Sequence, residues 1–171
     1  GSSTTTVIEK DKDGNVTHTT VTVKNPDGSS SSTTTDTSKP DYSKTESTTE
    51  TEDEDGNVTK VNTIVEHEVR KTVDKNGNVT VTVIDKTTVI TTVTDAMGNL
   101  VSETQSSVTT VKSETVDKDG NFVKEIVKTT TVEENGDETI VEAITTPTEG
   151  VENSRTTIIT TTYPDGRVEV R

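Results

Sequence analysis

The chain has 171 residues, a formal net charge of −14 at pH 7 and no cysteine. Its length suits one domain, and the absence of thiols excludes disulfides, thiolate metal sites and a cysteine nucleophile. A charge this negative repels nucleic acid and anionic membranes, so neither is an expected partner. Threonine (41 residues) and valine (25 residues) dominate a composition that is 24% hydrophobic and 2% aromatic. This predicts β-strands and a thin core that uses threonine methyl groups.

The first residues, Gly1, Ser2 and Ser3, resemble a cloning scar, so we expect a single all-β domain over residues 4–171. No targeting signal follows them, and the sequence indicates no localisation. It also contains no apolar stretch long enough to predict a membrane-spanning helix.

The N-terminal segments 4–10 and 16–24 are predicted strands, joined by the turn Lys12-Asp13-Gly14. Residues 29–53 then change to Ser, Thr, Lys, Asp and Glu. They allow two interpretations, a loosely held loop or two strands that turn near Lys39-Pro40-Asp41. We favour two strands, because the charges there stay in register with the strand that follows.

The central stretch, residues 58–132, has strand-like segments of about 17 residues between three-residue turns that end in glycine. A glycine at that place suits a type I turn closed by a left-handed residue. Four shorter predicted strands follow the long ones: 122–133, 138–146, 154–163 and 167–171. The three central turns are Lys75-Asn76-Gly77, Ala96-Met97-Gly98 and Lys118-Asp119-Gly120.

Turns of this kind also predict which residues face each other across a hairpin. The predicted register sets valine against valine and acid against base, and a slip of one residue would move every side chain to the other face. The predicted pairs are Val73 with Val79, Val69 with Val83, His67 with Asp85, Val93 with Val101, Val83 with Val111, Val111 with Val127, Glu114 with Lys124, Glu50 with Lys60 and Lys44 with Glu66.

The same register keeps odd-numbered residues opposite odd ones and so predicts two faces. Odd positions of 58–132 carry most valines and are expected to point inward, whereas even positions carry most charges and are expected to face solvent. Four isoleucines, Ile64, Ile84, Ile90 and Ile126, are even and depart from this pattern. A polar belt near the middle of each long strand predicts a wet waist or a bend; it comprises His67, Asp85, Lys86, Gln105, Ser106 and Ser107.

The turns predict eight to eleven strands in an antiparallel up-and-down meander without helices. Closure into a β-barrel is expected, because an open sheet of this width would expose long edges. A parallel solenoid with about 21 residues per turn is an alternative that the spacing of Gly56, Gly77, Gly98 and Gly120 permits. It would stack the Thr-x-Thr segments into a face suited to binding ice.

Three motifs with possible chemistry are interpreted as hairpin structure. The turn Asp-Lys-Asp-Gly-Asn, at 11–15 and 117–121, has an acid spacing reminiscent of calcium loops. The closest match to an EF-hand loop, residues 51–62, has Asp53, Asp55 and Gly56 in place but Thr51 and Asn62 where the end acids are needed. Asn-Val-Thr at 15–17, 57–59 and 78–80 matches the glycosylation acceptor as a by-product of turn and strand composition. His18 and His67 are the only histidines, and we interpret His67 with Asp85 as a structural pair.

The segment Asp95-Ala96-Met97-Gly98-Asn99-Leu100-Val101 is similar to the Asp-x-x-Gly-Asn-Leu core of bacterial YD (RHS) repeats. The repeats of that family recur about every 21 residues and form long antiparallel sheets around a cargo. Its tyrosine before the aspartate is replaced here by Lys10, Val73, Thr94 and Val116, and Tyr163-Pro164-Asp165-Gly166-Arg167 comes nearest to it.

The whole chain resembles a de novo designed β-protein, such as a designed barrel. Uniformly tight hairpin loops, strands filled with Thr, Val, Lys and Glu, and the scar at the start carry this resemblance. It implies a scaffold with no natural biochemical activity. The alternatives are a structural β-repeat segment of a bacterial shell or adhesin, and a designed pore or ligand-binding barrel. The chain is not expected to be an enzyme; no catalytic, cofactor-binding or metal-binding residue and no ligand is predicted, and the choice between monomer and homo-oligomer stays open.

Overall fold

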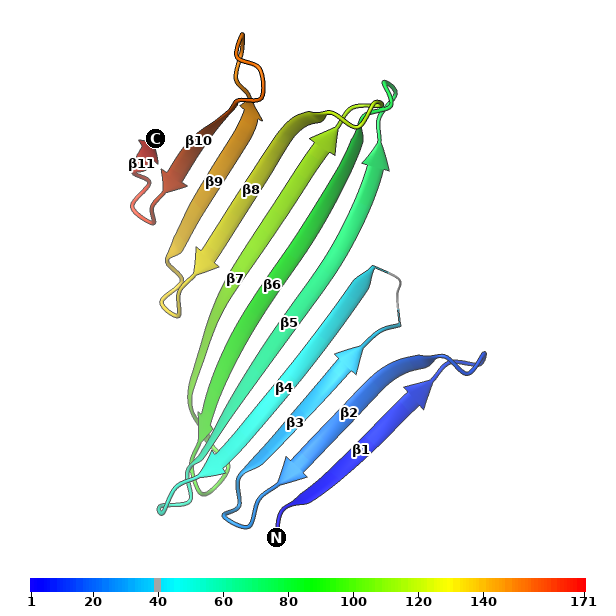
Figure 1. The fold of residues 1–171 in the computed structure, drawn as a ribbon. Coiled ribbons are helices and arrows are strands. Elements are labelled where there is room, and N and C mark those ends of the chain that lie inside the picture. Colours follow the sequence, from blue (N-terminus) through cyan, green and yellow to red (C-terminus); the bar gives the residue numbers. More distant parts are fainter. Residues whose placement is uncertain (39–40) are drawn as a thin grey trace. The chain divides into compact units, whose positions relative to one another are not determined.

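The structure is a computed structural model that describes residues 1–38 and 41–171. Within these ranges the chain forms eleven β-strands and no helix. The strands lie in one sheet in the order of the sequence, as an antiparallel meander (Figure 1). The strands are β1 (Ser3–Lys10), β2 (Val16–Lys24), β3 (Ser30–Asp36), β4 (Tyr42–Glu52), β5 (Val58–Val73), β6 (Val79–Thr94), β7 (Leu100–Val116), β8 (Phe122–Val132), β9 (Glu138–Pro147), β10 (Arg155–Thr162) and β11 (Val168–Val170).

The predicted meander is therefore confirmed, including its least certain part. Residues 29–53 form two strands, β3 and β4, rather than a loop. Of the turn predicted between them, Lys39 and Pro40 lie outside the described residues. Antiparallel neighbours also show that the parallel solenoid, and with it the proposed ice-binding face, was wrong.

Closure into a barrel is not confirmed. The order of hydrogen-bonded strands begins at β1 and ends at β11, and within the described ranges no hydrogen bonds join these two strands. The meander and the tight hairpins are established without closure of the sheet.

The chain divides into two compact units, which share the three long strands. The first comprises residues 1–67 and 87–106, and the second comprises residues 68–86 and 107–171. The boundaries fall within β5, β6 and β7, at the residues of the predicted polar belt. The bend or waist expected there, and the single domain over 4–171, stay predictions.

The hairpin turns have the predicted conformation. In the turn from β5 to β6 the Asp74 amide donates to the Asn78 carbonyl at 2.9 Å, and the Gly77 amide donates to the Asp74 carbonyl at 3.1 Å. Gly77 has a φ of 81°, in the left-handed region that glycine adopts without steric cost. The other Asp-x-x-Gly-Asn turns are closed by the same two bonds.

The predicted register is wrong by one residue in two hairpins. At the end of β7, Val116 faces Phe122 as expected. The predicted partner of Lys124 was Glu114, but its observed partner is Thr115. Val123 is thus an extra residue, a β-bulge, and every later pair shifts. Val111 faces Lys128 rather than Val127.

Between β6 and β7, hydroxyl pairs show a similar shift. Thr80 and Thr115 are 2.8 Å apart, and Thr82 and Ser113 are 2.9 Å apart. Val83 is therefore not opposite Val111. Between β4 and β5, the Thr48 hydroxyl lies 3.4 Å from the Asn62 carboxamide oxygen, in agreement with the predicted register there. The pairs predicted between β5 and β6, and the Val93 with Val101 pair, stay predictions.

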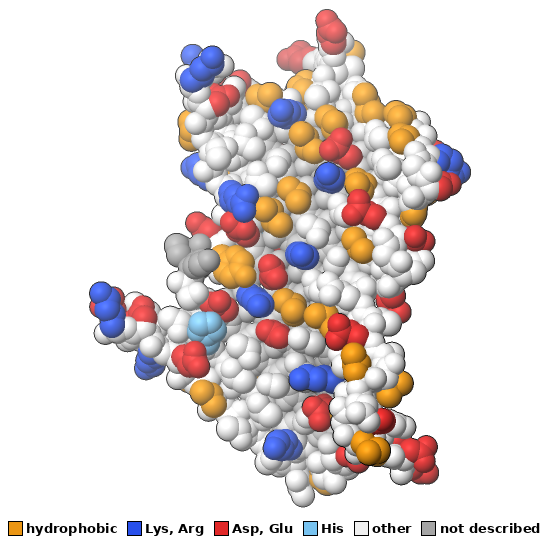
Figure 2. Space-filling view, turned by 180° about the vertical axis from the view of Figure 1, so that it is seen from behind, with side chains coloured by type: hydrophobic (Ala, Val, Ile, Leu, Met, Phe, Trp, Pro, Cys, Tyr) orange, Lys and Arg blue, Asp and Glu red, His pale blue; other side chains and the backbone are white. Residues whose placement is uncertain are grey.

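The bulges overturn the prediction of an odd inner face and an even outer face. Odd residues of β7 share a face with even residues of β8, so each face combines valines or isoleucines with charges. Figure 2 shows one side of the molecule, where hydrophobic side chains are interspersed with charged ones of both signs.

The sheet has no hydrophobic core within the described ranges. The only buried side chains there are Thr88 and Thr115, at 8% and 6% exposure. Cross-strand hydroxyl pairs occupy places that apolar contacts fill in most sheets, as between Thr20 and Thr34 at 3.0 Å. Pairing of strands, rather than layering of sheets, holds these residues together.

The Thr80 and Thr115 pair provides a first test. Replacing Thr115 by Val leaves the Thr80 hydroxyl without its partner, and we expect a loss of about 1 kcal/mol in the free energy of unfolding. Replacing both threonines by Val removes both polar groups and should restore most of that loss. Urea denaturation of the two single variants and the double variant measures the coupling, and additive effects would contradict it.

The turns provide a second test. Gly56 and Gly98 have φ values of 81° and 83°, but a Cβ at Gly56 would lie 3.0 Å from the Ala96 Cβ, whereas a Cβ at Gly98 would meet no described atom within 4 Å. We expect Gly98→Ala to lower the free energy of unfolding by about 1–2 kcal/mol, because alanine is strained in this backbone conformation. Gly56→Ala should lower it further, because its new Cβ would also clash with the Ala96 Cβ.

Ala96→Gly supplies the control in denaturant unfolding. In that background the two glycine substitutions should cost the same. An excess cost at Gly56 that persists would show that the close approach of the two turns is not its cause.

Candidate functional site

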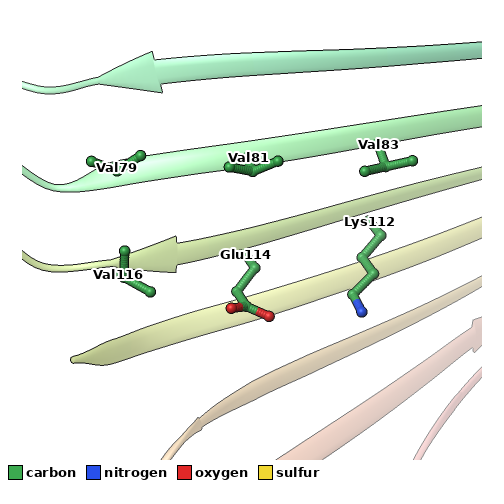
Figure 3. A pocket seen from close by; sticks show the side chains of 6 residues that line it. All are labelled: Val79, Val81, Val83, Lys112, Glu114 and Val116. Carbon is green, nitrogen blue, oxygen red and sulfur yellow. The ribbon is translucent and has the colours of Figure 1, made fainter. Parts of the chain in front are cut away.

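An open groove in the second unit is lined mainly by valines. It lies over β6 and β7, has a volume of about 330 Å³, and is lined by Val79, Val81, Val83, Lys112, Glu114 and Val116 (Figure 3). Alternate residues of a strand point to opposite faces. Because Thr80 and Thr82 bond to β7 on one face, the three valines between and beside them line the other.

Charged groups border this groove on the β8 side. The Lys112 ammonium lies 3.3 Å from a carboxylate oxygen of Glu125, and Glu114 lies two residues further along β7. The groove thus offers an apolar strip beside an ion pair. No histidine is among the residues that line it.

A row of charges in the first unit was not predicted. His18 faces Glu9 on β1 and Asp36 on β3, and Asp36 faces Lys44 on β4. The His18 ring places Nδ1 3.4 Å from Glu9 and Nε2 3.5 Å from Asp36. Lys44 in turn lies 3.9 Å from Glu46. Sequence reasoning missed this row, because no register was predicted for β2 with its neighbours.

The row is not arranged as a metal site. The carboxylates of Glu9 and Asp36 approach opposite nitrogens of the His18 imidazole, so their oxygens do not converge on one point. Across residues 1–38 and 41–171 no group of three His, Asp or Glu side chains is placed to hold a metal ion. The second histidine, His67, and the predicted partner Asp85 each have an interaction of their own; their pairing stays a prediction.

The five Asp-x-x-Gly-Asn turns share a side-chain arrangement that we name the Asp–Asn clasp. In the clasp of Asp117, one carboxylate oxygen accepts the amides of Asp119 and Asn121, both at 2.9 Å, and the other accepts the Asn121 carboxamide at 3.2 Å. The clasps begin at Asp11, Asp53, Asp74, Asp95 and Asp117.

The clasp explains both turn motifs structurally. Its carboxylate oxygens already accept hydrogen bonds from the turn, which leaves them poorly placed as calcium ligands. At the apparent glycosylation acceptors Asn15, Asn57 and Asn78, the carboxamide nitrogen donates to the clasp aspartate, at 3.1, 3.0 and 2.9 Å. Both motifs thus have roles in the hairpin turns.

The same hydrogen bonds perturb the titration of the clasps. Donation from the asparagine four residues on holds the pKa of each of the five aspartates below its ordinary value of 3.8. A folded-state pKa that is lowered contributes stability above the unfolded pKa, and this stability is lost as the pH falls through the folded value.

No protein-family model matches the chain, and neither a curated protein nor a solved structure matches it. In the part of the chain that the structure describes, no helix could cross a membrane.

The clasps predict acid sensitivity. We expect the stability of the protein to fall as the pH drops below about 3.8, and Asp117→Asn to weaken this fall while lowering stability at neutral pH. Asp119→Asn is the matched control, because it removes the same charge from the same turn and no hydrogen bond to its side chain occurs within the described ranges. Denaturant midpoints at neutral and acid pH provide the measurement; equal pH dependence in the two variants would contradict this role of the clasp.

Proposed function

We propose that the chain is a structural β-sheet scaffold, with no catalytic activity, whose function is the extended sheet itself. One observation carries this proposal: five Asp–Asn clasps close the ends of a meander in which the central strands run for 16 and 17 residues. Strands in globular proteins are usually about five or six residues long. Length and rigid turns serve an extended surface rather than a compact reaction site.

Two origins fit a scaffold of this kind. The uniform turns support the resemblance to a de novo designed protein, in which loops are chosen to suit each hairpin. The clasps at Asp53, Asp74, Asp95 and Asp117 recur about every 21 residues, which supports the alternative of a repeat segment from a bacterial shell or adhesin. Both origins assign the chain the same physical role.

The proposed scaffold has two alternative forms, an open sheet and a closed barrel. In a meander of eleven antiparallel strands the first and the last point the same way, so closure would need a parallel pair between β1 and β11. Only three residues of β11 are available for it. This favours an open sheet over a designed pore or ligand-binding barrel.

Amide hydrogen exchange tests the scaffold. We expect the slowest exchange in β6, which lies between the long strands β5 and β7, and faster exchange in the edge strands β1 and β11. Exchange at unfolded-chain rates in the three long strands would contradict the proposal.

Paired spin labels distinguish the open from the closed form. The chain has no cysteine, so Thr5→Cys and Thr161→Cys provide the only two attachment points. A barrel would bring the labelled strands within about two strand spacings, roughly 10 Å between backbones. We expect no such short distance; Thr5→Cys with Thr20→Cys, on the neighbouring strand β2, is the positive control.

A further inference from the structure

The second unit has an unpaired apolar surface on the side of the sheet opposite the valine groove. Ile126 on β8 faces Ile144 on β9, and Ile144 faces Ile158 on β10. These three side chains form one row across three neighbouring strands. We name the surface around them the isoleucine face; its apolar members are Ile126, Val132, Ile140, Ile144, Ile158, Val168 and Val170.

This face is exposed and has no second layer within the described ranges. The exposed fractions of Ile144, Ile158 and Val168 are 36%, 52% and 55%. Sheets in stable domains bury one face against another layer, because strand pairing alone leaves the apolar area in water. A second copy of the chain would supply such a layer.

The charges on the same face are balanced and self-complementary. On β8 and β9 it carries two lysines, Lys124 and Lys128, and two glutamates, Glu138 and Glu142, in a chain whose net charge is −14. Lys128 lies directly opposite Glu142, two residues along the strands from the isoleucine row. A surface that presents both signs in this way can face a copy of itself without net repulsion.

The opposite face of the same strands lacks this balance. On β8 and β9 its only charged side chain is Glu125, which pairs with Lys112 of β7. Two copies stacked through these strands would therefore form no ion pair between a lysine of one chain and a glutamate of the other. The isoleucine face is therefore the one that suits a second copy.

We propose that the isoleucine face is a dimer interface, which packs against the same face of a second copy of the chain. A two-fold axis parallel to the strands and midway between β8 and β9 exchanges these strands across the interface. It sets Ile126 opposite Ile144 of the second copy and Lys128 opposite Glu142 of the second copy. Packed sheets lie about 10 Å apart, a spacing that isoleucine side chains from both sides fill.

The dimer supplies the hydrophobic core that the single sheet lacks. The isoleucine row becomes buried between two layers, and two ion pairs related by the two-fold axis lie beside it, two residues along the strands. This inference is independent of the scaffold proposal, since a monomeric sheet would still be a scaffold.

Sedimentation equilibrium over about 1 µM to about 200 µM tests the interface directly. We expect a reversible dimer of the full chain. Ile144→Thr, which removes one apolar side chain from each copy, should raise the dissociation constant at least about tenfold. Val141→Thr is the matched control, because Val141 lies on the same strand with 37% exposure, against 36% for Ile144, but on the opposite face; it should leave the constant within about threefold.

A charge exchange between chains provides the second measurement. Lys128→Glu and Glu142→Lys should each weaken self-association, because each sets like charges opposite one another at positions 128 and 142 across the interface. When the two variants are mixed, one of them labelled with ¹⁵N, native mass spectrometry should show the heterodimer in excess over both homodimers. The cross-strand pair within each chain stays repulsive in this mixture, so recovery can only come from contact between chains.

Three results would overturn the proposal. The wild-type chain could remain monomeric throughout the range, or the mixed variants could form no excess of heterodimer. Association that survives Ile144→Thr but is lost in Val141→Thr would place the contact on the valine face. Far-UV circular dichroism of every variant shows whether the sheet is folded; an unfolded Ile144→Thr chain leaves the wild-type titration and the charge exchange to decide.

Discussion

Backbone hydrogen bonds between neighbouring antiparallel strands hold this structure, since within the described ranges no hydrophobic side chain is buried. A net contribution of about 0.5–1.5 kcal/mol per bond is modest, and the entropy of ordering each residue opposes it. The rest of the structure follows from that balance. Long strands form many backbone hydrogen bonds for each turn that the chain has to make. Side-chain hydrogen bonds within the turns then order most of the remaining residues.

The Asp–Asn clasp stabilises the turns that join the long strands. It combines a glycine in the left-handed region with a carboxylate that accepts the amides of the turn, as at Asp74 and Asn78. The aspartate satisfies donors that would otherwise depend on water. The same chemistry accounts for motifs that suggest calcium or glycan attachment when the sequence is considered without its hairpins.

The side chains of the sheet form two apolar surfaces and one polar row. The valine groove and the isoleucine face lie on opposite sides of the same unit. The row through His18 links residues of four strands.

The sequence by itself determined the strands, their antiparallel order and the conformation of their turns, because these depend on local preferences: threonine and valine favour extended backbone, and glycine closes each turn. Tertiary structure decided the register and therefore the faces. The bulge at Val123 follows from how β7 and β8 pair, and no glycine or proline marks it. One extra residue there moved Val111 from an expected valine partner to Lys128 and so changed which residues of β7 and β8 share a face, because alternate side chains of a strand always point to opposite sides.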